Sequence, residues 1–391
     1  MVKPAATTGT TQNLTHKQGA RMVELKAYQY RLTPTKGQVR LLEQTLELCR
    51  WVYNETLAYR KQIWEQQRLH IEPGKTNALL ASWKTSHPEL KRIHYHVLQD
   101  IQKRVHRACE AFVRRINRGQ KAGFPRFKGR GWYDSFTFRQ VGYSLSINGQ
   151  WINLFNIGRV RMILHRRIEG TIKTLTIRRT RTRKWYASFV VETQSKPLLP
   201  TNRAVGVDVG LHQFATLSTG EVIANPRFFR KDEKALRKAQ RRLAKTEQNT
   251  TERAKRQKVV AHIHERITNR RKDFAHKLSR RLVNEFDVIV FEQLRIAQMI
   301  KARRLAKSIS DAAWRQLITY THYKAASAGR MFVEVDPRGT SQRCSRCRSI
   351  VKKDLSTRQH RCQTCGLEID RDHNAALNIL AVGLHSLGRN P

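Results

Sequence analysis

The sequence predicts an α+β protein of several domains, and three observations lead to that prediction. Short alternating runs between Phe136 and Val191 predict an antiparallel barrel or sheet. Apolar residues at steps of three and four predict two long helices before it. Four cysteines in two C-x-x-C pairs predict a small metal-binding module near the carboxyl end. A chain of 391 residues has room for two to four such domains.

The charge of the chain predicts its class of partner. It has 76 Lys and Arg against 30 Asp and Glu, a formal net charge of +46. Such a chain repels itself unless a polyanion neutralises it, so nucleic acid is the expected partner and an acidic membrane a distant second. A hydrophobic content of 39% argues against a disordered basic tail. Without an apolar run near eighteen residues or a leader, we expect a cytoplasmic protein with no membrane partner.

The amino-terminal part predicts a tail, a strand and two helices. Residues 1–21 are polar and lack an apolar period, which predicts a flexible tail. Residues 23–32, VELKAYQYRL, alternate as in a strand until Thr33, Pro34 and Thr35 interrupt them. Two apolar stripes then predict helices. They consist of Val39, Leu42, Leu46, Cys49 and Tyr53, and of Val97, Ile101, Val105, Ala108, Phe112 and Ile116.

Basic and aromatic residues follow these stripes. The opposite face of the second helix carries Lys103, Arg104, Arg107, Arg114, Arg115 and Arg118. This is either a solvated face or, as we favour at this net charge, a nucleic-acid surface. Residues 119–131, GQKAGFPRFKGRG, mix aromatic and basic side chains on a backbone that cannot be helical. This segment is a basic linker or, as we prefer, a loop that clamps a nucleic-acid strand.

A break with two prolines, SKPLLPTNR, precedes the second half and marks a domain boundary. Further on, the basic segment from Arg227 to Arg280 predicts a helix or a helical hairpin laid along a phosphate backbone.

Three acidic positions in this half predict a catalytic metal site. Asp208 interrupts an apolar strand, Glu292 ends another, and Asp370 and Asp372 open a helix. Taken singly, the strand acids are more simply buried hydrogen-bonding or ion-pairing groups, and an Asp at a helix start is most often an N-cap. Together, acids 84 and 80 positions apart meet only if a sheet and a helix bring them together. Such a cluster suits two Mg²⁺ or Mn²⁺ ions that assist phosphodiester hydrolysis.

The cysteine pattern predicts one structural zinc ion. Cys344 and Cys347 form one pair, Cys362 and Cys365 the other, and fourteen residues separate the pairs. Two such turns complete a tetrahedral zinc site, and a redox pair is the weaker alternative. Gly366 follows the second pair and Arg348 the first, where we expect the arginine to tolerate the turn less easily. The remaining cysteines, Cys49 and Cys109, lie on the helical stripes and are expected to be buried free thiols.

These motifs together resemble one known family. GVDVGL around Asp208, VIVFEQL around Glu292, TSQRCSRC with HRCQTCG, and DRDHNAALNIL resemble TnpB, the transposon-encoded RNA-guided DNA endonucleases related to type V CRISPR effectors. YQYRLTPTKGQ, WVYNETL, GFPRFKGRG, NRRKDFAHKLS and LAKSISDAAW also fit that family. The resemblance extends from about Met22 to Leu380.

The resemblance implies a particular domain order. After the tail, the first strand of a wedge-like β-barrel occupies 22–35, a helical recognition domain 36–118, and the rest of the barrel 119–198. The first two parts of an RNase H-like, RuvC-type nuclease domain occupy 199–339, and a zinc-binding target-nucleic-acid module 340–369. The third nuclease part and the tail complete the chain at 370–391.

The resemblance also implies function and residues. Asp208, Glu292 and Asp372 become the catalytic ligands of two Mg²⁺ or Mn²⁺ ions, with Asp372 preferred over Asp370. The partners are a guide RNA from the transposon end and double-stranded target DNA, with one protein per RNA, at the nucleoid of a prokaryote. The residues expected to contact nucleic acid are Tyr53, Asn54, Lys61, Phe124, Arg126 and Lys128. Two other functions stay open: a regulator that binds guided DNA without cutting it, and a transposase that needs no RNA.

Overall fold

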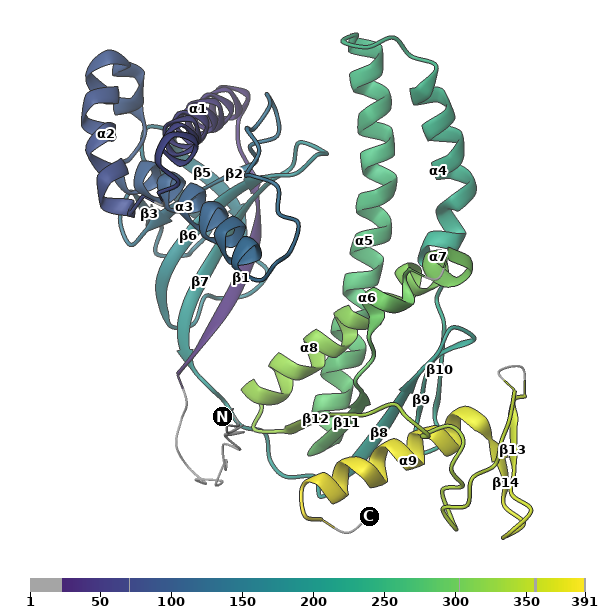
Figure 1. Ribbon diagram of the computed structural model, residues 1–391. Helices are drawn as coiled ribbons and strands as arrows, with labels where there is room; N and C mark the ends of the chain where they lie inside the picture. The colour runs from purple at the N-terminus through teal and green to yellow at the C-terminus, as the bar shows by residue number, and fades with distance from the viewer. Residues whose placement is uncertain (1–22, 70, 302, 355–356, 390–391) are drawn as a thin grey trace, which may run out of the picture.

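The computed structural model describes residues 23–69, 71–301, 303–354 and 357–389, so the tail predicted at 1–21 lies outside the described residues. The described chain forms two lobes, each built on its own sheet (Figure 1). The amino-terminal lobe has a seven-stranded sheet, and the carboxy-terminal lobe has a five-stranded sheet and a separate two-stranded one. The chain crosses between the lobes after Gln194, through the proline-containing segment.

The seven-stranded sheet is antiparallel throughout and nearly closed into a barrel. Its order is β2-β6-β7-β1-β5-β4-β3. Phe138 and Tyr143 on the two edge strands approach across the gap, with ring centroids 6.1 Å apart. The strands are β1 (Val23–Thr33), β2 (Ser135–Arg139), β3 (Tyr143–Leu145), β4 (Trp151–Leu154), β5 (Gly158–Ile163), β6 (Thr171–Arg179) and β7 (Trp185–Gln194). The alternating pattern between Phe136 and Val191 therefore predicted this part of the fold correctly.

Helices inserted between β1 and β2 cover this barrel. They are α1 (Lys36–Gln67), α2 (Pro73–Ser86), the short 3₁₀ helix η1 (Pro88–Arg92) and α3 (Tyr95–Asn117). Thr35 begins α1 with a capping box, because its hydroxyl accepts from Gln38 N and its own N–H donates to Gln38 Oε1. Both predicted stripes lie on helices. The first stripe and the beginning of the second, as far as Val105, join the barrel core, whereas Phe112 packs against Phe124 and Ile116 is exposed near the end of α3.

The basic face predicted on α3 needs one correction. Arg104 faces the barrel, where it pairs with Asp100 at 2.8 Å and donates to Ser135 O and Thr137 Oγ1 at 2.8 and 2.7 Å. Its guanidinium therefore fastens α3 to β2 and is not part of a surface for phosphate. Arg104 lies beside the apolar stripe, three residues after Ile101, so the barrel reaches it, whereas the other predicted basic residues of α3 are exposed: Lys103, Arg107, Arg114, Arg115 and Arg118.

The five-stranded sheet has the order β10-β9-β8-β11-β12. Its strands are β8 (Ala204–Val209), β9 (Gln213–Leu217), β10 (Val222–Ala224), β11 (Val288–Glu292) and β12 (Met331–Val335). β11 lies between β8 and β12 and runs parallel to both, whereas β9 and β10 are antiparallel additions. Parallel strands are buried on both faces, which explains the continuous apolar run of β11.

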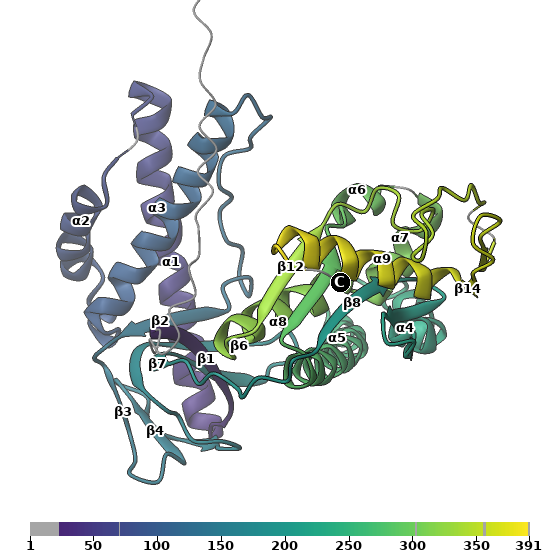
Figure 2. The same cartoon turned by 90° about the horizontal axis from the view of Figure 1, so that it is seen from below.

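Helices cover both faces of this sheet (Figures 1 and 2). Side chains of α5 and α8 share a core with Val207, Phe214 and Phe291 on one face, and α9 packs on Val288 and Val290 on the other. Between β10 and β11, α4 and α5 form the helical hairpin that the basic segment predicted. The helices are α4 (Phe228–Ala244), α5 (Thr251–Glu285), α6 (Ile296–Met299), α7 (Arg303–Ala312), α8 (Trp314–Ser327) and α9 (Arg371–Ser386). The strands β13 (Gln359–Arg361) and β14 (Glu368–Asp370) pair in a small module next to α9.

Polar contacts join the two lobes at two places. Glu265 on α5 accepts from Thr182 and Lys184 of the β6–β7 hairpin at 3.0 and 2.8 Å. Near the crossing of the chain, Ser327 donates to Glu24 on β1 at 3.0 Å. Within the described ranges, no helix is long and apolar enough to cross a membrane.

Candidate metal centres

Asp208 and Glu292 lie on neighbouring strands at the same edge of the five-stranded sheet. β8 and β11 are parallel, and their register pairs Val207 with Phe291, so the next residues of the two strands are the two acids. The carboxyl ends of parallel strands meet at one edge of a sheet. The register therefore brings together two residues that are 84 positions apart.

Strand alternation points both acids toward α9. Val205, Val207, Ile289 and Phe291 belong to the core under α5 and α8, so the residues between them face the opposite side. On that side Gly206 lies against α9, where an added Cβ would meet the Ala376 carbonyl oxygen at 2.2 Å. This glycine lets the helix approach the strand beside Asp208.

The first turn of α9 carries the third acid. Asp372 lies one helical turn before Ala376, the residue that touches Gly206. Its Oδ1 accepts from Nε and Nη2 of Arg371, both at 3.1 Å, and its Oδ2 lies 3.6 Å from Nη1 of Arg358. Asp370 is the N-cap, because its Oδ1 accepts from the N–H groups of residues 372 and 373.

The cluster is electrostatically strained. Burial raises the pKa of Asp208 well above its ordinary value, and the charges of Glu292 and Asp372 raise it further, while Arg371 opposes them. Burial also raises the pKa of Glu292, partly offset by a hydrogen bond from the Thr340 hydroxyl. Carboxylates held together out of water favour protonation unless a cation joins them.

These groups fit a hard divalent cation. Carboxylate oxygens are the ligands that Mg²⁺ and Mn²⁺ prefer, and the mutual repulsion of the acids is what a bound cation relieves. Among the described residues, the four thiols are the one set of three or more His, Cys, Asp or Glu whose ligand atoms all lie within 4.8 Å of one another.

The four predicted cysteines come together as a set. Cys344 Sγ lies 3.5 Å from Cys365 Sγ, and Cys347 Sγ lies 3.5 Å from Cys362 Sγ. Such spacings suit four thiolates around a tetrahedral zinc ion, whose Zn–S bonds are about 2.3 Å. Hydrogen bonds from the hydroxyl and backbone N–H of Ser349 lower the pKa of Cys347 to about 6, whereas burial and the other three thiols raise the pKa of Cys365 to about 12, as expected for sulfur atoms that share protons.

The two cysteine turns have matching backbones. Arg348 N donates to Cys344 O at 3.0 Å, and Gly366 N donates to Cys362 O at 2.9 Å. Arg348 has φ +67° and Gly366 φ +69°, a conformation that costs a residue with a Cβ. The arginine therefore occupies a turn that suits glycine, as the sequence indicated. Outside the cluster, Cys49 and Cys109 are buried free thiols, and burial raises the pKa of Cys49 to about 12.

Three of the predicted nucleic-acid contacts meet where the loop after α3 lies on α1. Asn54 Nδ2 donates to Lys128 O at 3.1 Å, and Lys128 N donates to Asn54 Oδ1 at 2.8 Å. The Lys128 ammonium lies over the ring of Tyr53, 5.6 Å from its centroid, and that ring is buried beside Tyr133. The Asn54 amide thus holds the loop in place.

The other three lie apart from this contact. Phe124 packs its ring against Phe112 on α3, with centroids 5.1 Å apart. Lys61, farther along α1, lies 3.5 Å from Glu65. Arg126 is exposed on the loop.

The structure also reveals partners of the acids that the sequence analysis did not identify. Thr340 contacts Glu292, and Arg358 and Arg371 contact Asp372. The position of Arg371 between two acids was a usable signal in the sequence. Thr340 has none, because it lies 48 positions from Glu292 and only the fold brings them together.

Comparison with known families gives three matching segments. A family described as "Probable transposase", OrfB of IS605, matches residues 188–303, and a "Cas12f1-like, TNB domain" matches 314–379. A "Helix-turn-helix domain" associated with OrfB of IS605 matches 22–68. Of that last segment, the structure describes 23–68 and forms a strand followed by one long helix there.

Solved structures share the fold. The Cas12f1–sgRNA–target DNA complex matches with a TM-score of 0.57 at 14% identity, over 88% of this chain and 83% of that one. The mini-RNA-guided endonuclease CRISPR-Cas_phi3 matches with a TM-score of 0.51 at 9% identity, over 92% of both chains. The protein therefore has an α+β fold of the kind found in Cas12 effectors.

Sequence relatives are closer. A "Putative RNA-guided DNA endonuclease" of Streptomyces pristinaespiralis is 35% identical, over 92% of this chain and 89% of the relative. The "Putative RNA-guided DNA endonuclease InsQ" of Escherichia coli K12 is 32% identical, over 93% of both. The "TnpB-like protein L79" of Acanthamoeba polyphaga mimivirus is 25% identical, over 95% of this chain and 76% of the relative. With such identity over most of their lengths, and with the matched OrfB segment, this chain belongs to the TnpB family.

Proposed function

We propose that the protein is an RNA-guided DNA endonuclease whose nuclease centre is formed by Asp208, Glu292 and Asp372. The observation that carries the proposal is the meeting of these acids at one edge of the five-stranded sheet, under the first turn of α9. Relatives at 35% and 32% identity bear the corresponding name.

The three carboxylates would hold two Mg²⁺ or Mn²⁺ ions, which activate a water molecule and stabilise the leaving oxygen of the cleaved phosphodiester. The chain's own residues prepare for this. Burial and the negative charges of Glu292 and Asp372 raise the pKa of Asp208, so its carboxyl group would release a proton when a cation binds. Asp370 supports the first turn by capping it, which leaves Asp372 as the acid available to a metal. Arg371 and Arg358 balance the Asp372 charge until metal and substrate arrive.

In this proposal the lobes have separate tasks. The barrel (22–35 and 119–198) with its helical insert (36–118) binds the guide RNA and the flanking motif of the target. The five-stranded sheet (199–339) and α9 (within 370–391) form a RuvC-type nuclease domain, and the module at 340–369 carries one structural zinc ion near target nucleic acid. One protein acts with one guide RNA, at the nucleoid of a prokaryotic cytoplasm.

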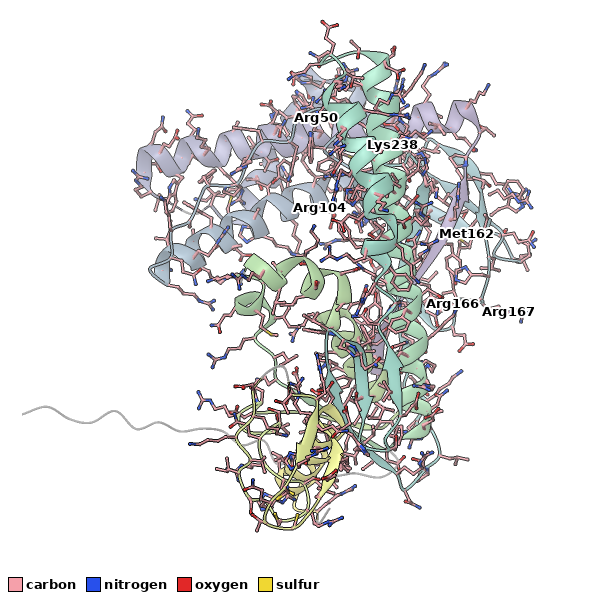
Figure 3. All side chains as sticks on the ribbon, turned by 90° about the vertical axis from the view of Figure 1, so that its right-hand side faces the viewer. Arg50, Arg104, Met162, Arg166, Arg167 and Lys238 are labelled. Carbon is pink, nitrogen blue, oxygen red and sulfur yellow. The ribbon has the colours of Figure 1, made fainter. Side chains whose placement is uncertain are left out.

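Charge supports a large polyanionic partner. If every acid were paired with one base, 46 Lys and Arg would still have no acidic partner. These side chains extend from both lobes, with Arg166 and Arg167 on the barrel and Lys238 on α4 as examples (Figure 3). A guide RNA paired with its DNA target brings dozens of phosphates, which is the neutralisation that such a chain needs.

We further propose that the amino-terminal lobe reads the flanking motif. The surface comprises the loop held on α1 and its neighbours: Tyr53, Asn54, Lys61, Phe124, Arg126 and Lys128. Because the exposed Arg126 can reach phosphate, its replacement should weaken binding equally for all motifs. Replacing Asn54 should free the loop and alter motif preference, which a cleavage screen on randomised flanks would measure.

The main test is a cleavage assay. The protein is expressed with flanking transposon DNA, purified with its RNA, and given a matching duplex with Mg²⁺. Guided cutting that stops when the RNA is removed is the expected result. Guided binding without cutting would instead indicate a regulator, and cutting or joining without RNA would indicate a conventional transposase.

A further inference from the structure

Two asparagines on α9 fasten the first cysteine turn to the helix. Asn374 Nδ2 donates to Arg343 O at 2.8 Å, and its Oδ1 accepts from Ser345 N at 3.0 Å. Asn378, one helical turn later, donates to Thr340 O at 2.8 Å and to Arg343 O at 2.7 Å. Both asparagines are buried, with exposed fractions of 0% and 2%. The segment that carries Cys344 is thus attached to the helix that carries Asp372.

The same segment contacts the second acid of the nuclease centre. The Thr340 hydroxyl lies within hydrogen-bonding distance of Glu292 Oε1 and, at 3.0 Å, of Pro337 O. A hydroxyl has one proton to donate, and the carboxylate is both the closer and the charged acceptor. Thr340 and Glu292 are also buried, at 5% and 9% exposed, so water competes little for this bond.

We propose that Thr340 is a positioning residue for Glu292, and that Asn374 and Asn378 hold it in place by clamping the first cysteine turn to α9. This inference rests on the proposed function and extends it. The zinc module then affects the nuclease centre through a defined chain of contacts. That chain runs from the Cys344 turn through the asparagine clamp to the Thr340 hydroxyl, and ends on the Glu292 carboxylate.

The physical argument concerns the orientation of the carboxylate. Glu292 is the last residue of β11, and its buried carboxylate accepts the Thr340 hydroxyl. A hydrogen bond to Oε1 selects one orientation and leaves Oε2 available as a metal ligand. Partners of this kind, which orient a ligand without touching the metal, typically contribute about 10–100-fold in metal affinity or activity. A merely structural Thr340 would instead affect the stability of the module.

The test compares Thr340→Val, Thr340→Ser and the neighbouring control Ser341→Ala. Valine keeps the shape of the threonine side chain but removes its hydroxyl, whereas serine keeps the hydroxyl and removes the methyl group. Ser341 is exposed on the same turn and serves as the control. Each protein is purified with its guide RNA and bound to a target that cannot be cleaved. Mn²⁺ binding is measured by electron paramagnetic resonance, zinc by elemental analysis, and target affinity by filter binding.

We expect Thr340→Val to raise the Mn²⁺ concentration for half-saturation by about tenfold or more, with zinc content and target affinity unchanged. Thr340→Ser and Ser341→Ala should bind Mn²⁺ as the wild type does. Wild-type Mn²⁺ binding by Thr340→Val, or a serine variant as weak as the valine variant, would overturn the inference. Failure of the wild-type complex itself to bind Mn²⁺ or to cut would refute the proposed function.

The clamp has its own variant, Asn378→Ala. Because the four thiols all lie outside α9, this protein should retain its zinc and still bind Mn²⁺ about as weakly as Thr340→Val. Combining the two substitutions should add little, since both act through one chain of contacts. Normal Mn²⁺ binding by Asn378→Ala, or full additivity, would remove the asparagines from the proposal.

Discussion

The two candidate metal centres of this protein are built in opposite ways. The four thiols come from two short turns within 22 residues, and their sulfur atoms already lie at distances suited to one zinc ion. The three carboxylates come from two strands and a helix spread over 165 residues, and they repel one another. The thiols could hold a zinc ion that stabilises their module, whereas the carboxylates carry unfavourable charge that a proton or a cation would relieve.

This difference separates structural from catalytic metal chemistry. A structural zinc site needs all its ligands in place before the ion arrives, because the ion has only to hold them. A catalytic site needs open coordination positions for water and substrate, so the protein does not fill its whole coordination shell. Experiments that remove one ligand from each centre should therefore give different losses.

The largest expected loss of DNA cutting comes from replacing one of the three carboxylates. Asp208→Ala, Glu292→Ala or Asp372→Ala should each lower guided DNA cutting by on the order of 10⁴-fold, and combining them should add little, because they act as a unit. Target binding should persist, since no phosphate contact is removed. The matched control is Asp273→Ala, which removes an exposed acid on α5. Substantial cutting by any of the three variants would remove that acid from the centre.

Replacing a thiol should reduce DNA cutting less than replacing a carboxylate, but it should change the structure of the module more. Cys344→Ser or Cys362→Ser should lower zinc content and loosen the module, and so reduce cutting by about 10–100-fold through the displaced contacts to α9 and Glu292. Elemental analysis, proteolysis of residues 340–369 and the cleavage assay measure the three effects. Cys109→Ala, which removes a thiol outside the cluster, should keep its zinc. Native protein without zinc would refute the assignment.

The raised pKa of Asp208 should make the stability of the folded protein depend on pH. Its folded pKa is raised, so its contribution to stability is full at low pH and is lost as pH rises through that pKa. In buffer without Mg²⁺ at pH 8, where the zinc module stays loaded, Asp208→Asn should therefore raise the melting temperature by about 2–4 °C. The gain should shrink at lower pH and reverse in saturating Mg²⁺, which needs the carboxylate. Scanning fluorimetry from pH 5 to 9 tests this, and a gain independent of pH and Mg²⁺ would contradict it.

The smallest effect concerns the acid next to the centre. Asp370→Ala should cost about 0.5–2 kcal/mol of helix stability by removing the N-cap, while Asp370→Asn should cost little because asparagine also caps well. Both should still cut DNA, and Asp372→Asn should not. The opposite pattern, with Asp370→Asn inactive and Asp372→Asn active, would show that Asp370 is the third ligand.

Much of the architecture could be predicted from local patterns. Alternation predicted the barrel strands between Phe136 and Val191, and the helical period predicted α1, α3 and the basic hairpin. Arg104 marks the limit of such patterns. We assigned it to the basic face of α3, yet it lies beside the apolar stripe, where β2 accepts hydrogen bonds from its guanidinium, while Lys103 and Arg107 on that face are exposed. A helical period describes one helix and cannot tell what packs on its other face.

The same limit divides the two metal centres. The sequence by itself determined the cysteine cluster, including the turn that Arg348 shares with Gly366, because a C-x-x-C turn sets its own geometry over a few residues. For the acids, the sequence identified candidate metal ligands but not their arrangement. Tertiary structure decided that Asp208 and Glu292 are adjacent, that Asp370 caps the helix while Asp372 faces Arg371, and that Thr340 reaches Glu292. These outcomes depend on strand register and on helix packing at Gly206, which are set by contacts between residues far apart in the chain.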